Sequence, residues 1–197
     1  MEYIAHRINT VKELESLPSE YGVELDLRDS GSRLILQHDP FSDGEDFEDY
    51  LKIYRHGTMI LNIKSERIEW RVLELLNKYN IRDYFFLDSS FPMIISLSNS
   101  GEKNIAVRFS EYEKTDTIVA VADRVRWVWV DCFSRLPIDN NIYDMLRKLG
   151  LKLCLVSPEL QAQGEKLEEY RDYLINTGIQ FDAVCTKVHN IEKWQVR

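Results

Sequence analysis

The sequence predicts an α/β protein in which eight strand–helix units form a compact (β/α)8 TIM barrel with a closed parallel sheet. Three observations lead to this prediction. Short apolar runs of β character alternate with helical segments along the whole chain. No internal repeat or low-complexity linker divides the 197 residues. Polar residues follow the carboxyl ends of the strands, where such barrels assemble their sites. We therefore expect a single domain over residues 1–197, without a large insertion.

The strands are expected where β-branched and aromatic residues cluster between turn residues. In the sixth strand, Trp127 and Trp129 alternate on one face, where core packing or barrel filling explains them at least as well as a substrate platform. The eight strands are expected at residues 3–6, 22–28, 58–64, 83–88, 104–110, 127–133, 152–157 and 181–186, with a short extended piece at 33–38 and an acidic loop at 41–46.

The helices are expected between these strands, each with a recognisable start, stop or apolar face. Asn9 or Thr10 caps the first helix and Pro18 closes it, while Gly150 stands at a C-cap position. The segment 65–80 carries apolar residues at helical spacing. The helices are expected at 10–17, 47–55, 65–80, 91–99, 115–124, 140–149 and 166–176, and a charged tail is expected after Lys187.

An open, doubly wound parallel sheet is the alternative fold. Its usual phosphate signature is a Gly-rich turn after the first strand. The residues at that position are His6, Arg7, Ile8 and Asn9, so the signature is absent and the barrel is favoured.

Composition and charge exclude several classes of function. The chain is 44% hydrophobic and 29% charged, as in an ordinary globular protein. A net charge of −8 argues against nonspecific binding to nucleic acid or to an anionic membrane. No apolar run approaches the ~20 residues of a membrane span, so we expect none. The sequence does not specify an oligomeric state.

The cysteines and the amino terminus indicate a cytoplasmic protein. Cys132, Cys154 and Cys185 are odd in number, unpaired in spacing and set within apolar runs, so buried free thiols are expected rather than disulfides or a zinc site. The first ten residues lack the basic and apolar regions of a signal peptide.

Two carboxylates on the second strand are the centre of the candidate site. Glu24 and Asp26 are two residues apart, so both point to one face, expected to be the core side, and the other face is covered by Val23, Leu25 and Leu27. Two adjacent carboxylates away from water need a cation or hydrogen-bond donors to compensate them. His6 and His38 end the flanking runs, and histidine exchanges protons near neutral pH. These four residues predict a hard-metal site with an acid/base pair.

Other polar residues end the remaining strands and are expected at the same rim of the barrel. They are Asn62, Lys64, Asp88, Arg108, Glu111, Asp131, Ser157, Glu159 and Thr186.

Several ordered motifs in residues 3–40 resemble the glycerophosphodiester phosphodiesterase family, which is grouped with the phosphatidylinositol-specific phospholipases C. His6-Arg7 is similar to the family's HRG, Asn9-Thr10 to its ENT, Glu24-Leu25-Asp26 to its ExD and His38-Asp39 to its HD. Two weaker matches follow: Leu61 to Lys64 stands where the family has LEIK, and Val184 to Lys187 where it has a final strand ending in TD. The resemblance implies a TIM-barrel, metal-dependent phosphodiesterase.

The resemblance also implies roles for individual residues. His6 and His38 would be the acid/base pair, and Arg7 and Lys64 would contact the phosphate, with Arg108 as a further candidate. The divalent cation would be Mg²⁺ or Ca²⁺, with Mn²⁺ as a further option, and the substrate a small or glycan-linked phosphodiester. The ligands of the cation would be Glu24 and Asp26, completed by Asn62 or Glu111.

The sequence departs from the family pattern at three places. Ile8 replaces the glycine of HRG, and the loop before Asn9 is too short to include the glutamate of ENT. Asn62 replaces the carboxylate of LEIK, which leaves less charge for the cation. The insertion found in many members is reduced to a short acidic loop and a helix. Two alternatives to hydrolysis therefore stay open: a lyase that stops at a cyclic phosphate, and a degenerate barrel that binds a phosphorylated ligand or a partner protein.

Overall fold

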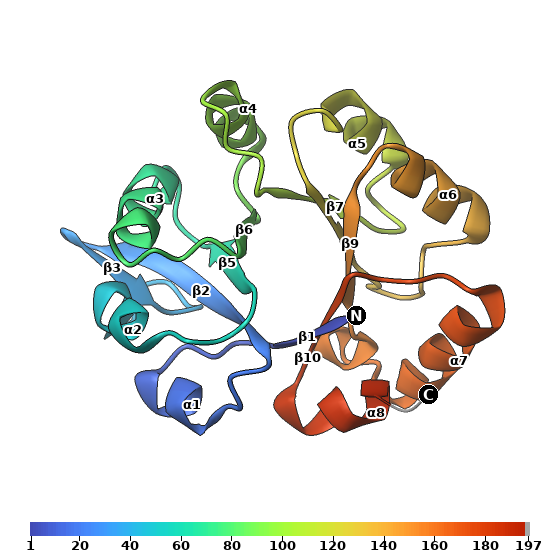
Figure 1. Ribbon diagram of the computed structural model, residues 1–197, viewed down its shortest axis with the longest axis horizontal. Helices are drawn as coiled ribbons and strands as arrows, with labels where there is room; N and C mark the ends of the chain where they lie inside the picture. Colours follow the sequence, from blue (N-terminus) through green and yellow to red (C-terminus); the bar gives the residue numbers. More distant parts are fainter. Residues whose placement is uncertain (196–197) are drawn as a thin grey trace.

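The computed structural model describes residues 1–195, whose strands form one sheet that curls on itself. Figure 1 shows the helices around the outside of this sheet and the strands toward the middle. Eight of the described strands pair in parallel and correspond to the eight expected ones. They are β1 (Glu2–Ala5), β2 (Gly22–Ser30), β5 (Met59–Ile63), β6 (Tyr84–Leu87), β7 (Ala106–Phe109), β8 (Trp127–Val130), β9 (Lys152–Val156) and β10 (Ala183–Thr186).

The sheet is mixed, not wholly parallel as the sequence led us to expect. Strand β3 (Arg33–Leu36) pairs antiparallel with the end of β2, and the two-residue β4 (Glu45–Asp46) pairs antiparallel with β3. The reason is local. Gly31 takes a positive φ of 62°, which turns the chain back on itself, and β2 is long enough to pair beyond the parallel strands.

The expected closure of the barrel also differs. Between β6 and β7 the pairing is one isolated parallel bridge, Phe86 with Ile105. The Phe86 N–H also donates to the Asn104 carbonyl at 2.8 Å. Both strands are four residues long, which limits the ladder they can form. The structure therefore has a curled sheet whose two arms meet at a weakly paired seam.

The expected helices follow the strands as predicted, and several have capping side chains or a C-terminal glycine. Thr10 and Glu13 form a capping box, Asp46 and Asp139 accept from first-turn N–H groups, and Gly178 ends its helix with a φ of 71°. None of the helices in residues 1–195 is both long and apolar enough to cross a membrane. The helices are α1 (Val11–Ser16), α2 (Phe47–Ile53), α3 (Glu69–Lys78), α4 (Phe91–Asn99), α5 (Thr115–Val121), α6 (Asn140–Lys148), α7 (Leu167–Thr177) and α8 (Ile191–Gln195), with 3-10 turns η1 (Pro158–Gln161), η2 (Gly164–Lys166) and η3 (Val188–Asn190).

The charged tail expected after Lys187 folds instead as η3 and α8. Trp194 explains the difference, because its ring is 3% exposed and its indole N–H donates to the Ser157 hydroxyl at 2.9 Å. Residues 196–197, also part of the expected tail, lie outside the described residues.

Two apolar layers fill the molecule, one on each face of the curled sheet. The larger layer lies between strands and helices and includes Leu25 and Val128. The smaller layer is the inside of the curl, where Phe85 stacks on Trp127 with ring centroids 4.6 Å apart. Trp127 and Trp129 are both buried here, so they fill the interior and are not a substrate platform. All three cysteines are buried and free, as expected.

Amide protons at the β6–β7 seam are expected to exchange faster than those of the fully laddered β8–β9 pair. An isolated bridge leaves more backbone groups to local opening than a continuous ladder does. Hydrogen–deuterium exchange of peptides covering 84–87 and 104–109, compared with 127–130 and 152–156, measures the difference. Equal protection at the two places would show that the seam is as tightly closed as the rest of the sheet.

Candidate functional site

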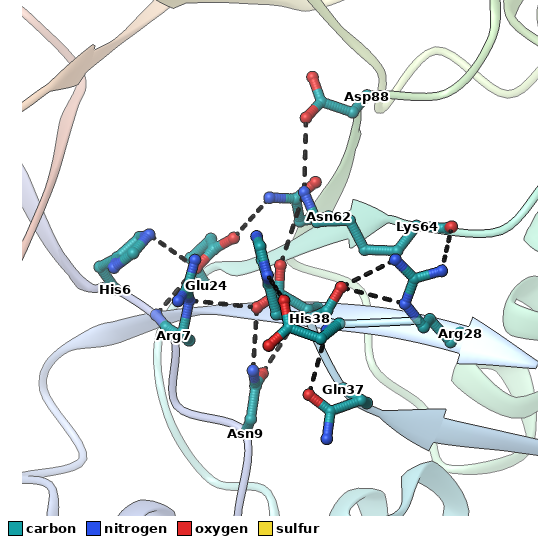
Figure 2. A network of polar contacts seen from close by, with 12 residues as sticks. His6, Arg7, Asn9, Glu24, Arg28, Gln37, His38, Asn62, Lys64 and Asp88 are labelled. Atoms are coloured by element: carbon teal, nitrogen blue, oxygen red, sulfur yellow. Dashed lines mark hydrogen bonds and ion pairs between the residues drawn. The ribbon is translucent and has the colours of Figure 1, made fainter. Parts of the chain in front are cut away.

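The candidate site lies where β1 and β5 end, beside the first half of β2 (Figure 2). Gly22 is the first residue of β2. A Cβ at this position would lie 2.5 Å from the Thr58 carbonyl oxygen, so glycine allows the start of β2 to approach the backbone just before β5 closely. From there the strand alternates. Leu25 packs in the sheet–helix layer, whereas Glu24 and Asp26 face the inside of the curl and are each 1% exposed. The two carboxylates are therefore buried side by side, as the sequence predicts.

Glu24 is held by groups from β1 and β5. The Arg7 backbone N–H donates to its Oε2 at 2.8 Å, and the Asn62 amide donates to its Oε1 at 2.8 Å. His6 Nε2 lies 3.7 Å from Oε2. Asn62 reaches Glu24 because it stands beside Asp26 in the parallel register of β5 with β2.

Asp26 is compensated by a reciprocal amide contact and by two cations. Asn9 Nδ2 donates to Asp26 Oδ2 at 2.9 Å, and the Asp26 N–H donates back to Asn9 Oδ1 at 2.9 Å. Arg7 Nε and Lys64 Nζ lie 3.5 and 3.6 Å from the carboxylate oxygens. Because these two cations are beyond hydrogen-bond distance, they hold Asp26 loosely and can share their charge with a bound anion.

Burial sets the protonation of the pair formed by His6 and Glu24. Burial, followed by the charge of Asp26, raises the pKa of Glu24 to about 7. Burial, followed by the charge of Arg7, lowers the pKa of His6 to about 4. At neutral pH the His6 imidazole is therefore uncharged and able to accept a proton, while Glu24 still retains one in part of the molecules.

The donor atoms fit a hard divalent cation. Glu24 and Asp26 supply carboxylate oxygens, and the Asn62 Oδ1 atom is buried without a hydrogen-bond partner. An unsatisfied buried amide oxygen next to an undercompensated acid pair has the chemistry of a Mg²⁺ or Ca²⁺ ligand. Within residues 1–195 no three His, Cys, Asp or Glu side chains come together in a group that could hold a metal ion.

Glu111, the other candidate for the third ligand, has its contacts elsewhere. It follows β7, and its Oε1 accepts from the Ser134 N–H at 2.5 Å and the Ser134 hydroxyl at 2.6 Å. These contacts hold Glu111 to the loop after β8. Its proposed role as a ligand stays a prediction, and Asn62 is the residue that the structure brings to Glu24.

His38 reaches the site from the hairpin that follows β2. The Gln37 N–H donates to the Asp26 carbonyl at 2.9 Å, which places the next residue at the same rim. His38 Nδ1 lies 2.7 Å from Asp39 Oδ1, and its side chain is 40% exposed. In the view of Figure 2, His38 and His6 lie on opposite sides of Arg7. Asp39 therefore orients the ring and leaves Nε2 available for proton transfer.

The polar rim continues past Lys64, whose Nζ also lies 3.7 Å from Asp88 Oδ2. Arg108, the remaining phosphate candidate, pairs with Asp88 and Asp131 and lies 3.8 Å from Glu113. Three carboxylates thus share the Arg108 charge. Arg7 and Lys64 have the weaker internal partners, and they are the better placed cations for a phosphate.

Sequence reasoning missed Arg28 as a site residue, and named Asp39 only within a motif. Arg28 lies two residues beyond Asp26 on the same face of β2, so the alternation that picked out the carboxylates could also have found it. Asp39 could have been found as a carboxylate next to a candidate catalytic histidine. The backbone contacts of Arg28, by contrast, have no signal in the sequence.

The fold is similar to that of solved glycerophosphodiester phosphodiesterases. A glycerophosphodiester phosphodiesterase from Agrobacterium tumefaciens str. C58 matches with a TM-score of 0.65 and 15% identity, over 94% of this chain and 96% of that one. A putative glycerophosphoryl diester phosphodiesterase from the same organism gives 0.66 and 11%, over 94% and 93%. One from Parabacteroides distasonis ATCC 8503 gives 0.64 and 13%, over 98% and 85%. Neither a protein-family model nor a curated protein matches the sequence. At these identities the similarity shows the fold.

Replacing Glu24 with Gln is expected to change how stability depends on pH. The Glu24 pKa is raised from 4.5 to about 7, so between these pH values the folded protein retains a proton that the unfolded chain releases. The contribution of Glu24 to the unfolding free energy therefore falls as the pH rises through this range. His6 acts with the opposite sign between pH 4 and 6.5, because its pKa is lowered from 6.5 to about 4. In the wild type the two effects offset each other.

Glu24→Gln leaves the His6 effect alone. The unfolding free energy of the variant minus that of the wild type is therefore expected to increase by up to about 3 kcal/mol from pH 4.5 to pH 8. Urea unfolding in EDTA at the two pH values measures the gain, with the exposed Glu15→Gln as the matched control. Parallel pH curves for Glu24→Gln and the wild type would rule out a raised Glu24 pKa.

Proposed function

We propose that this protein is a metal-dependent phosphodiester hydrolase that acts on a small or glycan-linked phosphodiester. The observation that carries the proposal is the convergence of a buried acid pair, a neutral histidine and two loosely paired cations at one rim of the fold. The similarity of the fold to solved phosphodiesterases supports it.

The chain's own residues divide the reaction between them. His6, uncharged at neutral pH, removes the proton of the attacking hydroxyl or water, and His38, oriented by Asp39, protonates the leaving oxygen. Arg7 and Lys64, which are only loosely paired with Asp26, stabilise the negative charge that builds on the non-bridging phosphate oxygens. Glu24, Asp26 and Asn62 would hold Mg²⁺, Ca²⁺ or Mn²⁺, which supplies Lewis-acid stabilisation of the same oxygens.

Purified protein is expected to hydrolyse bis(p-nitrophenyl) phosphate or a glycerophosphodiester in the presence of Mg²⁺, Mn²⁺ or Ca²⁺, and to lose this activity in EDTA. His6→Ala and His38→Ala are each expected to lower kcat by about 10²–10⁴-fold, because each removes a proton-transfer group. The exposed His189→Ala is the matched control and should retain wild-type activity.

The products and the controls separate this hydrolase from its alternatives. Phosphorus NMR that finds a cyclic phosphate as the final product would assign the chain as a lyase. No turnover with any of the three ions, together with no heat of metal binding in calorimetry, would contradict the enzymatic function and favour a ligand-binding protein.

Divalent cations are expected to stabilise the fold more at pH 8 than at pH 5.5. A cation at this site must displace the proton on Glu24, and fewer molecules hold that proton at the higher pH. Thermal unfolding with and without Ca²⁺ measures the rise in Tm at each pH. Asn62→Asp is expected to increase the rise, because a carboxylate adds charge to the ligand set. An equal rise for the wild type, Asn62→Asp and Glu24→Gln would place the cation elsewhere.

A further inference from the structure

Arg28 shares the inward face of β2 with the two buried carboxylates. Glu24, Asp26 and Arg28 are spaced by two residues, so the strand presents them as one row. Arg28 stands just beyond the last residue of β2 in register with β5, Leu27, and lies opposite Ile35 in the antiparallel pairing with β3. The proposed catalytic groups on either side of β2 come from the loops that follow β3 and β5.

The guanidinium of Arg28 connects these two loops through their backbones. Its Nε and Nη2 donate to the His38 carbonyl at 3.0 and 2.8 Å, and its Nη1 donates to the Lys64 carbonyl at 2.8 Å (Figure 2). Within residues 1–195 no carboxylate forms an ion pair with Arg28. In this part of the chain, the hydrogen bonds of its guanidinium all go to two backbone carbonyls.

Both anchored residues have proposed roles in the reaction. His38 follows β3, which ends at Leu36, and its ring contacts Asp39, whose own side chain is 74% exposed. The backbone of the loop is thus the firm part of its support. Both backbone polar groups of Lys64 bind β2: its N–H donates to the Leu27 carbonyl at 2.9 Å, and its carbonyl accepts from the Arg28 side chain.

We propose that Arg28 is a positioning residue: its fork of N–H groups sets the His38 imidazole and the Lys64 ammonium at a fixed separation across the scissile phosphodiester. This inference rests on the proposed function, because it assigns a purpose to the geometry of that site. The side-chain hydrogen bonds of Arg28 go to none of the three proposed metal ligands, and its role needs no contact with substrate. A lysine cannot take its place, since an ammonium lacks the planar fork that reaches both carbonyls at once.

The surroundings of Arg28 allow chemical rescue of an Arg28→Ala variant by free guanidinium. Arg28 lines a cavity of about 550 Å³, together with residues of the β2–β3 hairpin and of the loop after β3. Free guanidinium can enter a cavity of this size and replace the lost head group. Arg33 lines the same cavity, is exposed and pairs with Asp43 at 3.2 Å, so Arg33→Ala is a matched control.

The test compares Arg28→Ala, Arg28→Lys, Arg33→Ala and His38→Ala on two substrates. These are bis(p-nitrophenyl) phosphate, whose leaving group needs little protonation, and a glycerophosphodiester with an alkoxide leaving group. His38→Ala is expected to lose more activity on the second substrate. Arg28→Ala and Arg28→Lys should show the same bias between substrates, with kcat lowered by about 10–100-fold, because a small displacement of a catalytic group costs this much. Millimolar guanidinium should restore part of the Arg28→Ala activity.

A second measurement does not depend on turnover. NMR relaxation of the His38 ring, assigned by its loss in His38→Ala, is expected to show added motion in both Arg28 variants and none in Arg33→Ala. If Arg28→Ala is too unstable to study, Arg28→Lys gives the same comparison.

The outcomes separate this proposal from the proposed function. Unchanged His38 motion in the Arg28 variants, or an activity loss equal on both substrates and not restored by guanidinium, would overturn the positioning role. Inactive wild-type protein would contradict the proposed function, while the ring relaxation would still decide whether Arg28 holds His38 in place.

Discussion

The burial of two carboxylates side by side on β2 is the constraint on which the rest of the site depends. Neither Glu24 nor Asp26 can reach bulk water, and the mutual repulsion of the pair adds to the cost of burial. Nearby polar groups offset part of this cost with hydrogen bonds and positive charge. An amide from β5 and a backbone N–H after β1 bind Glu24, and Asn9 with two cations surrounds Asp26.

That compensation is incomplete, which is why the site is a candidate for chemistry and not only a structural network. The pKa of Glu24 is raised although two donors already bind it, and the Asn62 Oδ1 atom has no partner. Both features cost free energy in the folded state, so the acid pair is only partly compensated by the protein itself. The other side of the rim is different. There Arg108 lies among three carboxylates, so its charge is already engaged by groups of the protein itself.

Strand β2 is the hub that makes this arrangement possible. It pairs with β1, β3 and β5, and each of these neighbours ends next to residues of the site. The hairpin that makes the sheet mixed also brings His38 to the carboxylates, through the contact of Gln37 with the Asp26 carbonyl. Arg28 then ties the ends of β3 and β5 together. The departure from a purely parallel sheet is therefore part of how the site is built.

The sequence by itself determined the order of the eight parallel strands and of helices α1 to α7, and the face on which Glu24 and Asp26 lie, because strand periodicity and helix caps are local properties of the chain. It also indicated the ends of β1, β2 and β5 as the place of the site. Only the tertiary structure decided that the β6–β7 seam is held by one bridge, that Trp194 anchors the last helix, and that Asn62 rather than Glu111 meets Glu24. It also decided which carbonyls Arg28 binds. These are contacts between segments far apart in the chain, and their partners depend on how the sheet curls.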